Sequence, residues 1–215
     1  MSVANTMSEA EYREFALTAE GKLFELWNGV PRQKPPMNIM HNAVASYLGF
    51  ALANQLDRRI HCVNVNGGRA RCSARTYYIP DVIVIPRVVQ ELYDPDALGA
   101  YAEPLSLVVE VWSWTEEPYD FTTKLSAYRE RGDEGVWFTH PYERTLTTWS
   151  RQPDGNYIEE SFNPGVVPVN ALPGVTIDLA TIFEPGGPAP QTPVPRHPSP
   201  TTRLIVPPPS TSSPR

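Results

Sequence analysis

The stretch Ile79-Pro80-Asp81-Val82-Ile83-Val84-Ile85 sets one carboxylate at the start of an otherwise apolar run. A second run of the same kind, Leu-Val-Val-Glu-Val over residues 107–111, carries Glu110 near its end. Short runs rich in Val and Ile are typical of buried central strands. Because burial of an unpaired charge is costly, two such strands with one acid each predict two acids that converge on a cation.

Lys124 completes the set, in the stretch Tyr-Asp-Phe-Thr-Thr-Lys-Leu-Ser-Ala-Tyr over residues 119–128, which has the pattern of a helix. Hydrolysis of a phosphodiester needs a water nucleophile and relief of charge on the phosphoryl oxygens, and a hard divalent cation held by carboxylates supplies both. A nearby lysine orients the water, lowers its pKa or stabilises the transition state. We therefore expect Asp81 and Glu110 as metal ligands, the backbone carbonyl of Val111 as a further oxygen ligand, and Lys124 as the catalytic lysine.

Each of these residues also has a purely structural interpretation. An aspartate after a proline is common in turns, a glutamate in a strand is often an ion-pair partner, and a lone helix lysine is usually solvated. The prediction of a hydrolytic site therefore rests on the combination of Asp81, Glu110 and Lys124.

The order of the expected elements is mixed. Ser8 and Glu11 predict a capping box for a helix over residues 8–17, and Asn28-Gly29 predicts a hairpin. A second hairpin is expected around Asn66, and a polar loop over residues 87–104. The remaining expectations are helices over residues 39–56 and 118–131 and strands over residues 135–139, 145–149 and 156–161. This order predicts an α/β or α+β domain with a sheet covered by helices.

Composition divides the chain of 215 residues into three parts. Residues 1–10 are expected to be a flexible leader, residues 11–184 one globular domain, and residues 185–215 a disordered tail. The tail holds 11 of the 24 prolines, three arginines and no acid, so it cannot bury enough apolar surface to fold. Such a tail is suited to binding a protein partner.

The net charge of −6 argues against a large nucleic-acid footprint. The tail contributes +3, so residues 1–184 carry −9. Arg69, Arg71 and Arg75 are spaced to share one strand face, which is either a strip for phosphate or a solvated face.

Cys62 and Cys72 are the two cysteines, and a zinc site would need His41 and His61 at an unusual spacing. Reduced thiols in a cytosolic protein are the simpler interpretation. The chain has no apolar leader at its start and no apolar run of about 18 residues. We therefore expect a cytoplasmic protein that does not contact a membrane.

The combined stretches resemble a bacterial family of putative restriction endonucleases, long catalogued as a domain of unknown function, in the PD-(D/E)xK nuclease superfamily. The resemblance spans roughly residues 20–180 and rests on residues 24–29, 78–84, 107–113 and 136–141. Its spacing is met by five residues: Glu110, Ser113, Asp120, Lys124 and Tyr128. His41 lies where a histidine often begins the first long helix, and a packing or capping role for it is preferred over a ligand role.

The resemblance implies a restriction-endonuclease-like core, with a mixed central sheet flanked by helices and extra N-terminal and C-terminal strands. It implies that Asp81 and Glu110 bind Mg²⁺ or Mn²⁺, that Glu25 is an outer ligand, and that Lys124 replaces a lysine usually found at the place of Trp112. It also implies a DNA substrate and a homodimer. The chain departs from the family in the loop with Glu116 and Glu117, whose acids would repel phosphate, and at His140, where an aspartate is expected.

Three functions follow from these observations. The first is a metal-dependent endonuclease that hydrolyses phosphodiester bonds in DNA. The second is a catalytically silent module that binds nucleic acid or protein on a nuclease fold. The third is a metal-dependent hydrolase of RNA or another phosphodiester, which the fold does not distinguish from the first.

Overall fold

The computed structural model describes residues 6–113 and 118–184, apart from the side chains of residues 118–120. The predicted tail over residues 185–215 and the first five residues of the predicted leader lie outside this part of the chain. The last residues of the leader belong to the fold, because Ser8 caps the first helix and Glu9 begins it.

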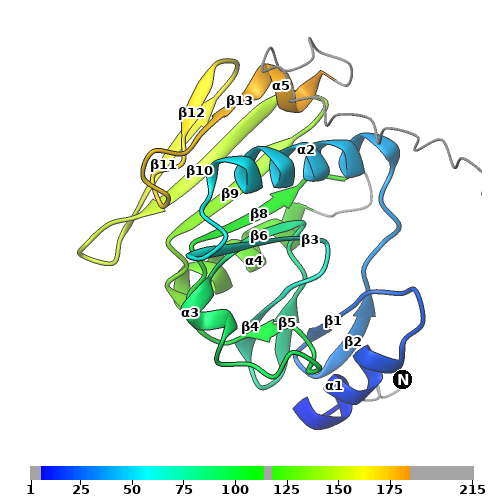
Figure 1. Cartoon of the computed structure of the whole chain (residues 1–215). Helices are drawn as coiled ribbons and strands as arrows, with labels where there is room; N and C mark the ends of the chain where they lie inside the picture. Colours follow the sequence, from blue (N-terminus) through cyan, green and yellow to red (C-terminus); the bar gives the residue numbers. More distant parts are fainter. Residues whose placement is uncertain (1–5, 114–117, 185–215) are drawn as a thin grey trace, which may run out of the picture.

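Six strands form the mixed central sheet that was predicted, in the order β11-β10-β9-β8-β6-β3 (Figure 1). Strands β8 and β9 are parallel, and every other neighbouring pair is antiparallel. The strands are β3 (His61–Val65), β6 (Val82–Pro86), β8 (Leu107–Val111), β9 (Gly135–His140), β10 (Thr145–Arg151) and β11 (Tyr157–Phe162).

A second, smaller sheet has the order β2-β1-β5-β4-β7. Strands β1 and β2 meet at Asn28 and Gly29, whose φ angles of 49° and 87° are those of the predicted hairpin turn. Helix α1 (Glu9–Thr18) packs on this sheet and begins with the predicted capping box of Ser8 and Glu11. The strands are β1 (Phe24–Trp27), β2 (Val30–Gln33), β4 (Arg69–Ser73), β5 (Thr76–Tyr78) and β7 (Ala100–Tyr101).

The hairpin predicted around Asn66 is wrong, although both of its strands exist. Strand β3 pairs with β6 in the central sheet, whereas β4 pairs with β5 and β7 in the small sheet. The turn therefore passes the chain from one sheet to the other. Gly68 allows this crossing, because a Cβ atom there would lie 2.0 Å from Ile83 Cδ1. The loop predicted over residues 87–104 also contains helix α3 (Arg87–Gln90) and β7.

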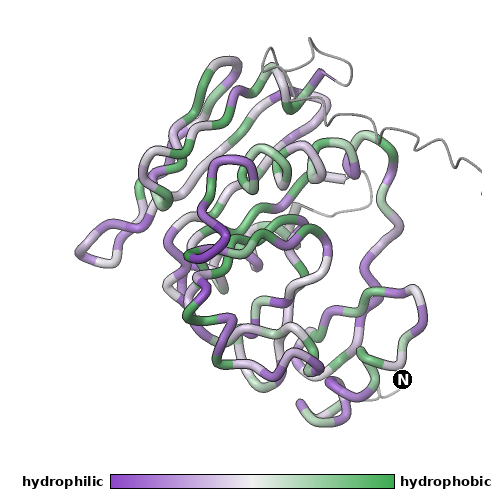
Figure 2. The backbone as a smooth tube through the Cα atoms, viewed as in Figure 1, coloured by the Kyte–Doolittle hydropathy of each residue, from purple (hydrophilic) through white to green (hydrophobic). Residues whose placement is uncertain are grey.

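Helices cover both faces of the central sheet. Helix α2 (Ile39–Gln55) and α5 (Leu179–Phe183) pack on one face with the ribbon of β12 (Val166–Pro168) and β13 (Thr176–Asp178). Helix α4 (Pro118–Arg131), which is followed by Gly132 with a φ angle of 79°, packs on the other face (Figure 1). Val82 and Val84 of β6 belong to the core under α2, and Ile83 and Ile85 to the core under α4. Burial on both faces explains the apolar run in this strand, which is coloured as hydrophobic in Figure 2.

The candidate phosphate strip of arginines is bound within the fold. Arg71 forms an ion pair with Glu9 of α1 at 2.9 Å, and Arg69 Nε donates to the hydroxyl of Tyr12 on the same helix at 3.1 Å. Arg75 lies in the turn after β4 and donates to the carbonyl of Asn28 at 2.6 Å. The three side chains therefore do not share one solvated strand face, because Arg69 and Arg71 contact α1 whereas Arg75 is exposed in the turn. Contact of these arginines with phosphate stays a prediction.

The two cysteines are free thiols, and burial raises the pKa of Cys72 to about 12. Within residues 6–113 and 118–184, no group of three or more His, Cys, Asp or Glu side chains is arranged to hold a metal ion, so the zinc alternative has no support there. None of the helices in the described part of the chain combines the length and apolarity that crossing a bilayer requires.

Glu9 is expected to make stability depend on pH. Hydrogen bonds from Arg71 above all, and from Tyr77 and Arg13, outweigh burial and lower the pKa of Glu9 from 4.5 to about 2. The ionised form therefore stabilises the fold at neutral pH, and this contribution is lost as the pH falls from about 4.5 toward 2. Glu9→Gln should lower the free energy of unfolding by about 1–2 kcal/mol at pH 7.

Chemical denaturation at neutral pH and near pH 3 tests this expectation, with Glu14→Gln on an exposed position of the same helix as the control. The difference between the Glu9 variant and wild type should shrink in acid. An equal difference at both pH values would show that the carboxylate charge is not the stabilising feature.

Candidate active site

The two predicted acids lie side by side on neighbouring strands. Asp81 directly precedes β6 and Glu110 is the fourth residue of β8. The register pairs Val82 with Val109, and the Asp81 N–H donates to the Val109 carbonyl at 3.0 Å. Because these strands are antiparallel, Asp81 and Glu110 occupy neighbouring positions one residue beyond that pair. Their side chains are buried, with relative exposures of 0% and 1%.

Every oxygen of the Asp81 carboxylate has a partner. Oδ1 accepts from Lys34 Nζ at 2.7 Å, while Oδ2 accepts from the Val111 N–H at 2.7 Å and lies 3.1 Å from His41 Nε2. Burial alone would raise the pKa of Asp81, but Lys34 and His41 outweigh it and hold the pKa below its ordinary value. Asp81 is therefore ionised and fully compensated.

Glu110 is held differently. Its Oε1 accepts from the hydroxyl of Tyr128 at 2.6 Å, whereas its Oε2 is buried without a hydrogen-bond partner among the described residues. Burial raises the pKa of Glu110 to about 7 against the opposing effect of Lys124, whose Nζ lies 3.6 Å from Oε2. The two acids thus differ in the ease with which they ionise.

Lys124 bridges Glu110 to a third acid. Its Nζ lies 3.2 Å from Oε1 of Glu25, which also accepts from the Ile79 N–H at 2.9 Å. Lys124 and Tyr128 stand one turn apart on α4, so one helix face supplies both groups that contact Glu110. The four residues singled out by sequence, Asp81, Glu110, Lys124 and Glu25, therefore meet in one cluster.

Sequence reasoning missed Lys34. It follows β2 in a proline-rich break that gives no sign of burial, yet its Nζ also donates to the carbonyl of Ile79 at 2.6 Å. His41 lies in the first turn of α2, where its N–H donates to the side chain of the capping residue Asn38, and its imidazole packs against Asp81. A buried acid without a sequence-local cation is the one signal that could have prompted a search for such a lysine.

The donors at this cluster are of the kind that Mg²⁺ prefers. Carboxylate oxygens are hard ligands, and magnesium commonly takes one or two of them and keeps several waters. The Oε2 of Glu110, which accepts no hydrogen bond among the described residues, is an acceptor that a cation would satisfy. On Asp81, however, the ammonium of Lys34 already contacts Oδ1, so it stands where a cation bound to that oxygen would have to lie.

The structure describes only some of the other residues that match the motifs of the family or depart from them. Trp112, at the usual place of the lysine, stacks on His140 with ring centroids 4.3 Å apart, and Ser113 is buried. The His140 ring also accepts from the Glu143 N–H at 3.1 Å, which makes it a structural residue of the turn after β9. The side chain of Asp120, and Glu116 and Glu117 entirely, lie outside the described residues.

Comparison with known proteins gives one family and one fold. A family model named Uma2, with the description "Putative restriction endonuclease", matches residues 10–180. The structure is similar to the crystal structure of a putative nuclease belonging to DUF820 from Anabaena variabilis, with a TM-score of 0.67 and 17% sequence identity over 82% of this chain and 97% of that chain. A search of curated proteins finds no match. At this identity the structural likeness establishes the fold, which is the nuclease-like α+β fold expected from the sequence.

The buried pair of Lys34 and Asp81 should show strong energetic coupling. Asp81→Asn or Lys34→Met alone leaves one buried charge with fewer partners and should cost about 3–5 kcal/mol of unfolding free energy. The double variant should cost less than the two single variants together by about 1–3 kcal/mol.

Denaturation of the four proteins in the cycle measures this coupling. The exposed pair of Asp57 and Arg59, which is also 2.7 Å apart, is the matched control and should couple by less than about 1 kcal/mol. Equal coupling in both pairs would mean that burial does not determine the strength of the Lys34–Asp81 pair.

Proposed function

The chain belongs to the Uma2 family, described as putative restriction endonucleases, and on this premise we propose that it is a metal-dependent endonuclease that hydrolyses phosphodiester bonds in DNA. The observation that carries the proposal is the convergence of Asp81, Glu110 and Lys124, from two strands and a helix, at one buried point. A lysine that served only as a solvent-exposed surface residue would not be buried between two carboxylates.

The proposed roles follow from the contacts. Asp81 and Glu110 would hold Mg²⁺ or Mn²⁺, with the Val111 carbonyl at the end of β8 as a further oxygen donor. When bound, the cation supplies charge for the phosphoryl oxygens and acidifies a water. Lys124 would orient a water molecule for attack on phosphorus. The bond from phosphorus to the leaving oxygen would break as the bond to water forms, and the proton that the water loses would balance the one that the leaving oxygen takes up. Glu25 holds the Lys124 ammonium in place at 3.2 Å.

Nicking of supercoiled plasmid in Mg²⁺ or Mn²⁺ tests the proposal. Wild type should convert supercoiled to open-circular DNA, and Asp81→Asn, Glu110→Gln and Lys124→Met should each reduce the rate by about 100-fold or more. Glu110→Gln is the variant best able to fold, since its amide can keep the bond from Tyr128. Thermal unfolding of each variant verifies the fold.

Lys22→Met and Glu91→Gln are the matched controls, because they remove the same charges from exposed positions. They should nick at the wild-type rate. Single-stranded DNA and RNA are tested beside the plasmid, and cleavage of RNA alone would replace DNA as the substrate. Cleavage that persists in all three site variants would show that the activity arises elsewhere.

A specific observation favours a second function, a catalytically silent module that binds nucleic acid or protein. Lys34 compensates Asp81, Lys124 contacts both Glu110 and Glu25, and none of these groups exposes more than a tenth of its side chain. The cluster is thus nearly neutral without any bound cation. A protein that kept this fold only for binding would gain stability from such internal pairing.

Lys34 should compete with a divalent cation if the cluster is a metal site. Removing one charge-assisted hydrogen bond from Asp81 in Lys34→Met should tighten Mn²⁺ binding by about 10-fold, as measured by calorimetry or Mn²⁺ magnetic resonance. Lys22→Met should leave the affinity unchanged. Absence of Mn²⁺ binding in both wild type and Lys34→Met would favour the silent module, independently of any cleavage assay.

A further inference from the structure

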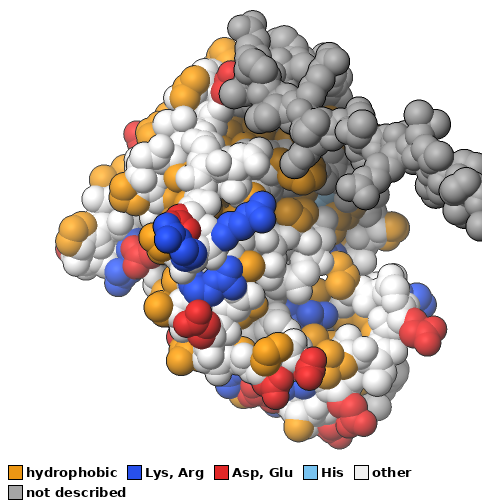
Figure 3. All heavy atoms as spheres, in the orientation of Figure 1, with side chains coloured by type: hydrophobic (Ala, Val, Ile, Leu, Met, Phe, Trp, Pro, Cys, Tyr) orange, Lys and Arg blue, Asp and Glu red, His pale blue; other side chains and the backbone are white. Residues whose placement is uncertain are grey.

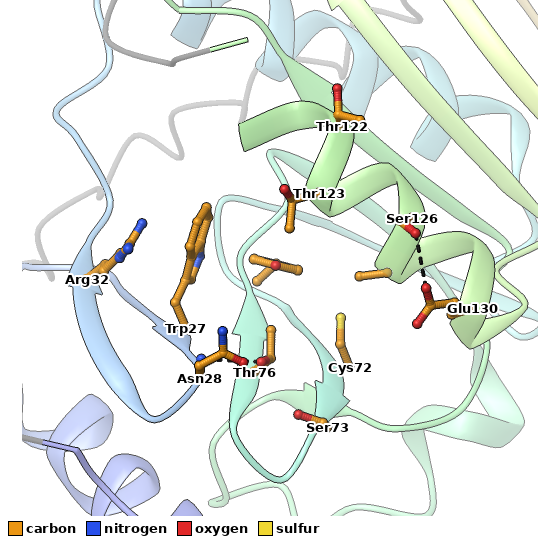
Figure 4. Close-up of a pocket in the computed structure, with 12 residues that line it drawn as sticks. Trp27, Asn28, Arg32, Cys72, Ser73, Thr76, Thr122, Thr123, Ser126 and Glu130 are labelled. Atoms are coloured by element: carbon orange, nitrogen blue, oxygen red, sulfur yellow. Dashed lines mark hydrogen bonds between the residues drawn. The ribbon is translucent and has the colours of Figure 1, made fainter. Parts of the chain in front are cut away.

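A pocket of about 670 Å³ lies beside the charged cluster, between the small sheet and α4 (Figure 4). The hairpin of β1 and β2 supplies Trp27, Asn28 and Arg32 to one wall. Helix α4 supplies the facing wall, with Thr122, Thr123, Ser126, Ala127 and Glu130. Pockets for small molecules have volumes of about 300–1,000 Å³. The pocket therefore has the size of a site for a nucleoside.

Aromatic side chains connect this pocket to the acids. Trp27 Nε1 donates to Glu25 Oε2 at 3.3 Å, and the Trp27 indole meets the Tyr78 ring edge-on at 5.7 Å. Tyr78 in turn meets Tyr128, which donates to Glu110, and the Lys124 ammonium lies 5.6 Å from the centre of the Tyr78 ring. The aromatic side chains of Trp27, Tyr78 and Tyr128 thus lie between the pocket and the charged cluster.

The pocket wall offers a stacking platform. The Arg32 guanidinium lies over the Trp27 indole, 4.1 Å from its centroid, and the two side chains stand side by side in Figure 4. Indole rings and guanidinium planes are the groups on which proteins stack unpaired nucleobases. Asn28, Ser73 and Thr76 line the same pocket, and their hydroxyl and amide groups are donors and acceptors for the edge of a base.

The charge of the wall suits a base better than a phosphate. Arg32 and Glu130 are its two charged residues and carry opposite signs, and Cys72 is a neutral thiol. The exposed basic residues Arg58 and Arg59 lie elsewhere, near the start of β3, which pairs with the end of β6 remote from Asp81. Figure 3 shows basic side chains gathered in that region and acidic ones over α1. Among the described residues that line the pocket, Arg32 is therefore the one basic side chain.

We propose that this pocket binds one unpaired nucleobase of the substrate, stacked on the Trp27–Arg32 pair, so that the adjoining backbone lies toward Lys124. The inference rests on the proposed function, since it makes the pocket a subsite of the nuclease centre. It identifies the substrate class as nucleic acid with an accessible base, either a single strand or a duplex from which a base is extruded.

Binding measured without cleavage tests the proposal. Fluorescein-labelled oligonucleotides that contain one 5-iodouracil are titrated into the full-length protein in EDTA, followed by anisotropy, and then irradiated to crosslink the base to a stacked aromatic ring. We expect the crosslink at Trp27. Single strands and duplexes with a mismatched 5-iodouracil should bind, and a fully paired duplex should bind more weakly because the base must first leave the stack.

Two substitutions at Trp27 separate stacking from the hydrogen bond to Glu25. Trp27→Phe and Trp27→Ala both lose that bond, but only the alanine variant loses the ring. Affinity should therefore stay close to wild type in Trp27→Phe and fall by about 10-fold or more in Trp27→Ala. Arg32→Met should also weaken binding, whereas Arg59→Met, which removes the same charge from a distant exposed position, should not.

The salt dependence gives an independent readout. One or two phosphate contacts predict a shallow slope of log affinity against log salt, of about −0.7 to −1.4 for a single strand. A steep slope, equal losses in Arg32→Met and Arg59→Met, or a crosslink away from Trp27 would overturn the proposal. Should Trp27→Ala fail to fold, Arg32→Met and the crosslink decide the result.

The two proposals fail separately. Suppose that cleavage of plasmid or single strands requires Asp81 but that binding does not depend on Trp27. This result would refute base binding in the pocket and would leave the proposed nuclease activity intact. A Trp27 crosslink in a protein that cleaves no nucleic acid in Mg²⁺ or Mn²⁺ would refute the nuclease and support a base-binding module.

Discussion

The fold is organised around the compensation of charges that are buried where the two sheets and α4 meet. Asp81 and Glu110 have no access to bulk water, and an unpaired charge at either position would cost several kilocalories per mole. Compensation comes from distant parts of the chain: Lys34 after the small sheet's hairpin, His41 at the start of α2, and Lys124 on α4. The burial of both acids in the central sheet therefore depends on the small sheet, α2 and α4 together.

The two acids at this junction are not equivalent. Asp81 makes contacts at both oxygens and keeps a pKa below its ordinary value, so it is a fixed negative charge. Glu110 keeps one oxygen without a hydrogen-bond partner among the described residues, and burial raises its pKa to about 7. The cluster therefore has one anchored carboxylate and one carboxylate whose charge depends on what approaches it. Such asymmetry is common where a protein has to bind and release a cation or move a proton.

Local signals in the sequence predicted the parts of this arrangement that depend on neighbouring residues. The Ser8 capping box, the Asn28-Gly29 turn and the apolar runs around Asp81 and Glu110 each carry their own physical cause within a few residues. The partners of charged side chains depend instead on contacts between distant segments. For that reason the sequence showed neither the pairing of Lys34 with Asp81 nor the pairing of Arg71 with Glu9, and the turn signal at Asn66 did not reveal that its two strands enter different sheets.

The same pairing of charges limits how this protein can recognise a polyanion. Residues 1–184 carry a net charge of −9, and Arg69, Arg71 and Arg75 are held by contacts within the fold. Attraction between a basic face and phosphate, which supplies most of the affinity in many nucleic-acid-binding proteins, is therefore weak here. Stacking does not depend on net charge, because every base has an aromatic face. A nuclease with this surface would then select substrate by the accessibility of a base beside the Trp27–Arg32 pair, and a fully stacked duplex would be its poorest substrate.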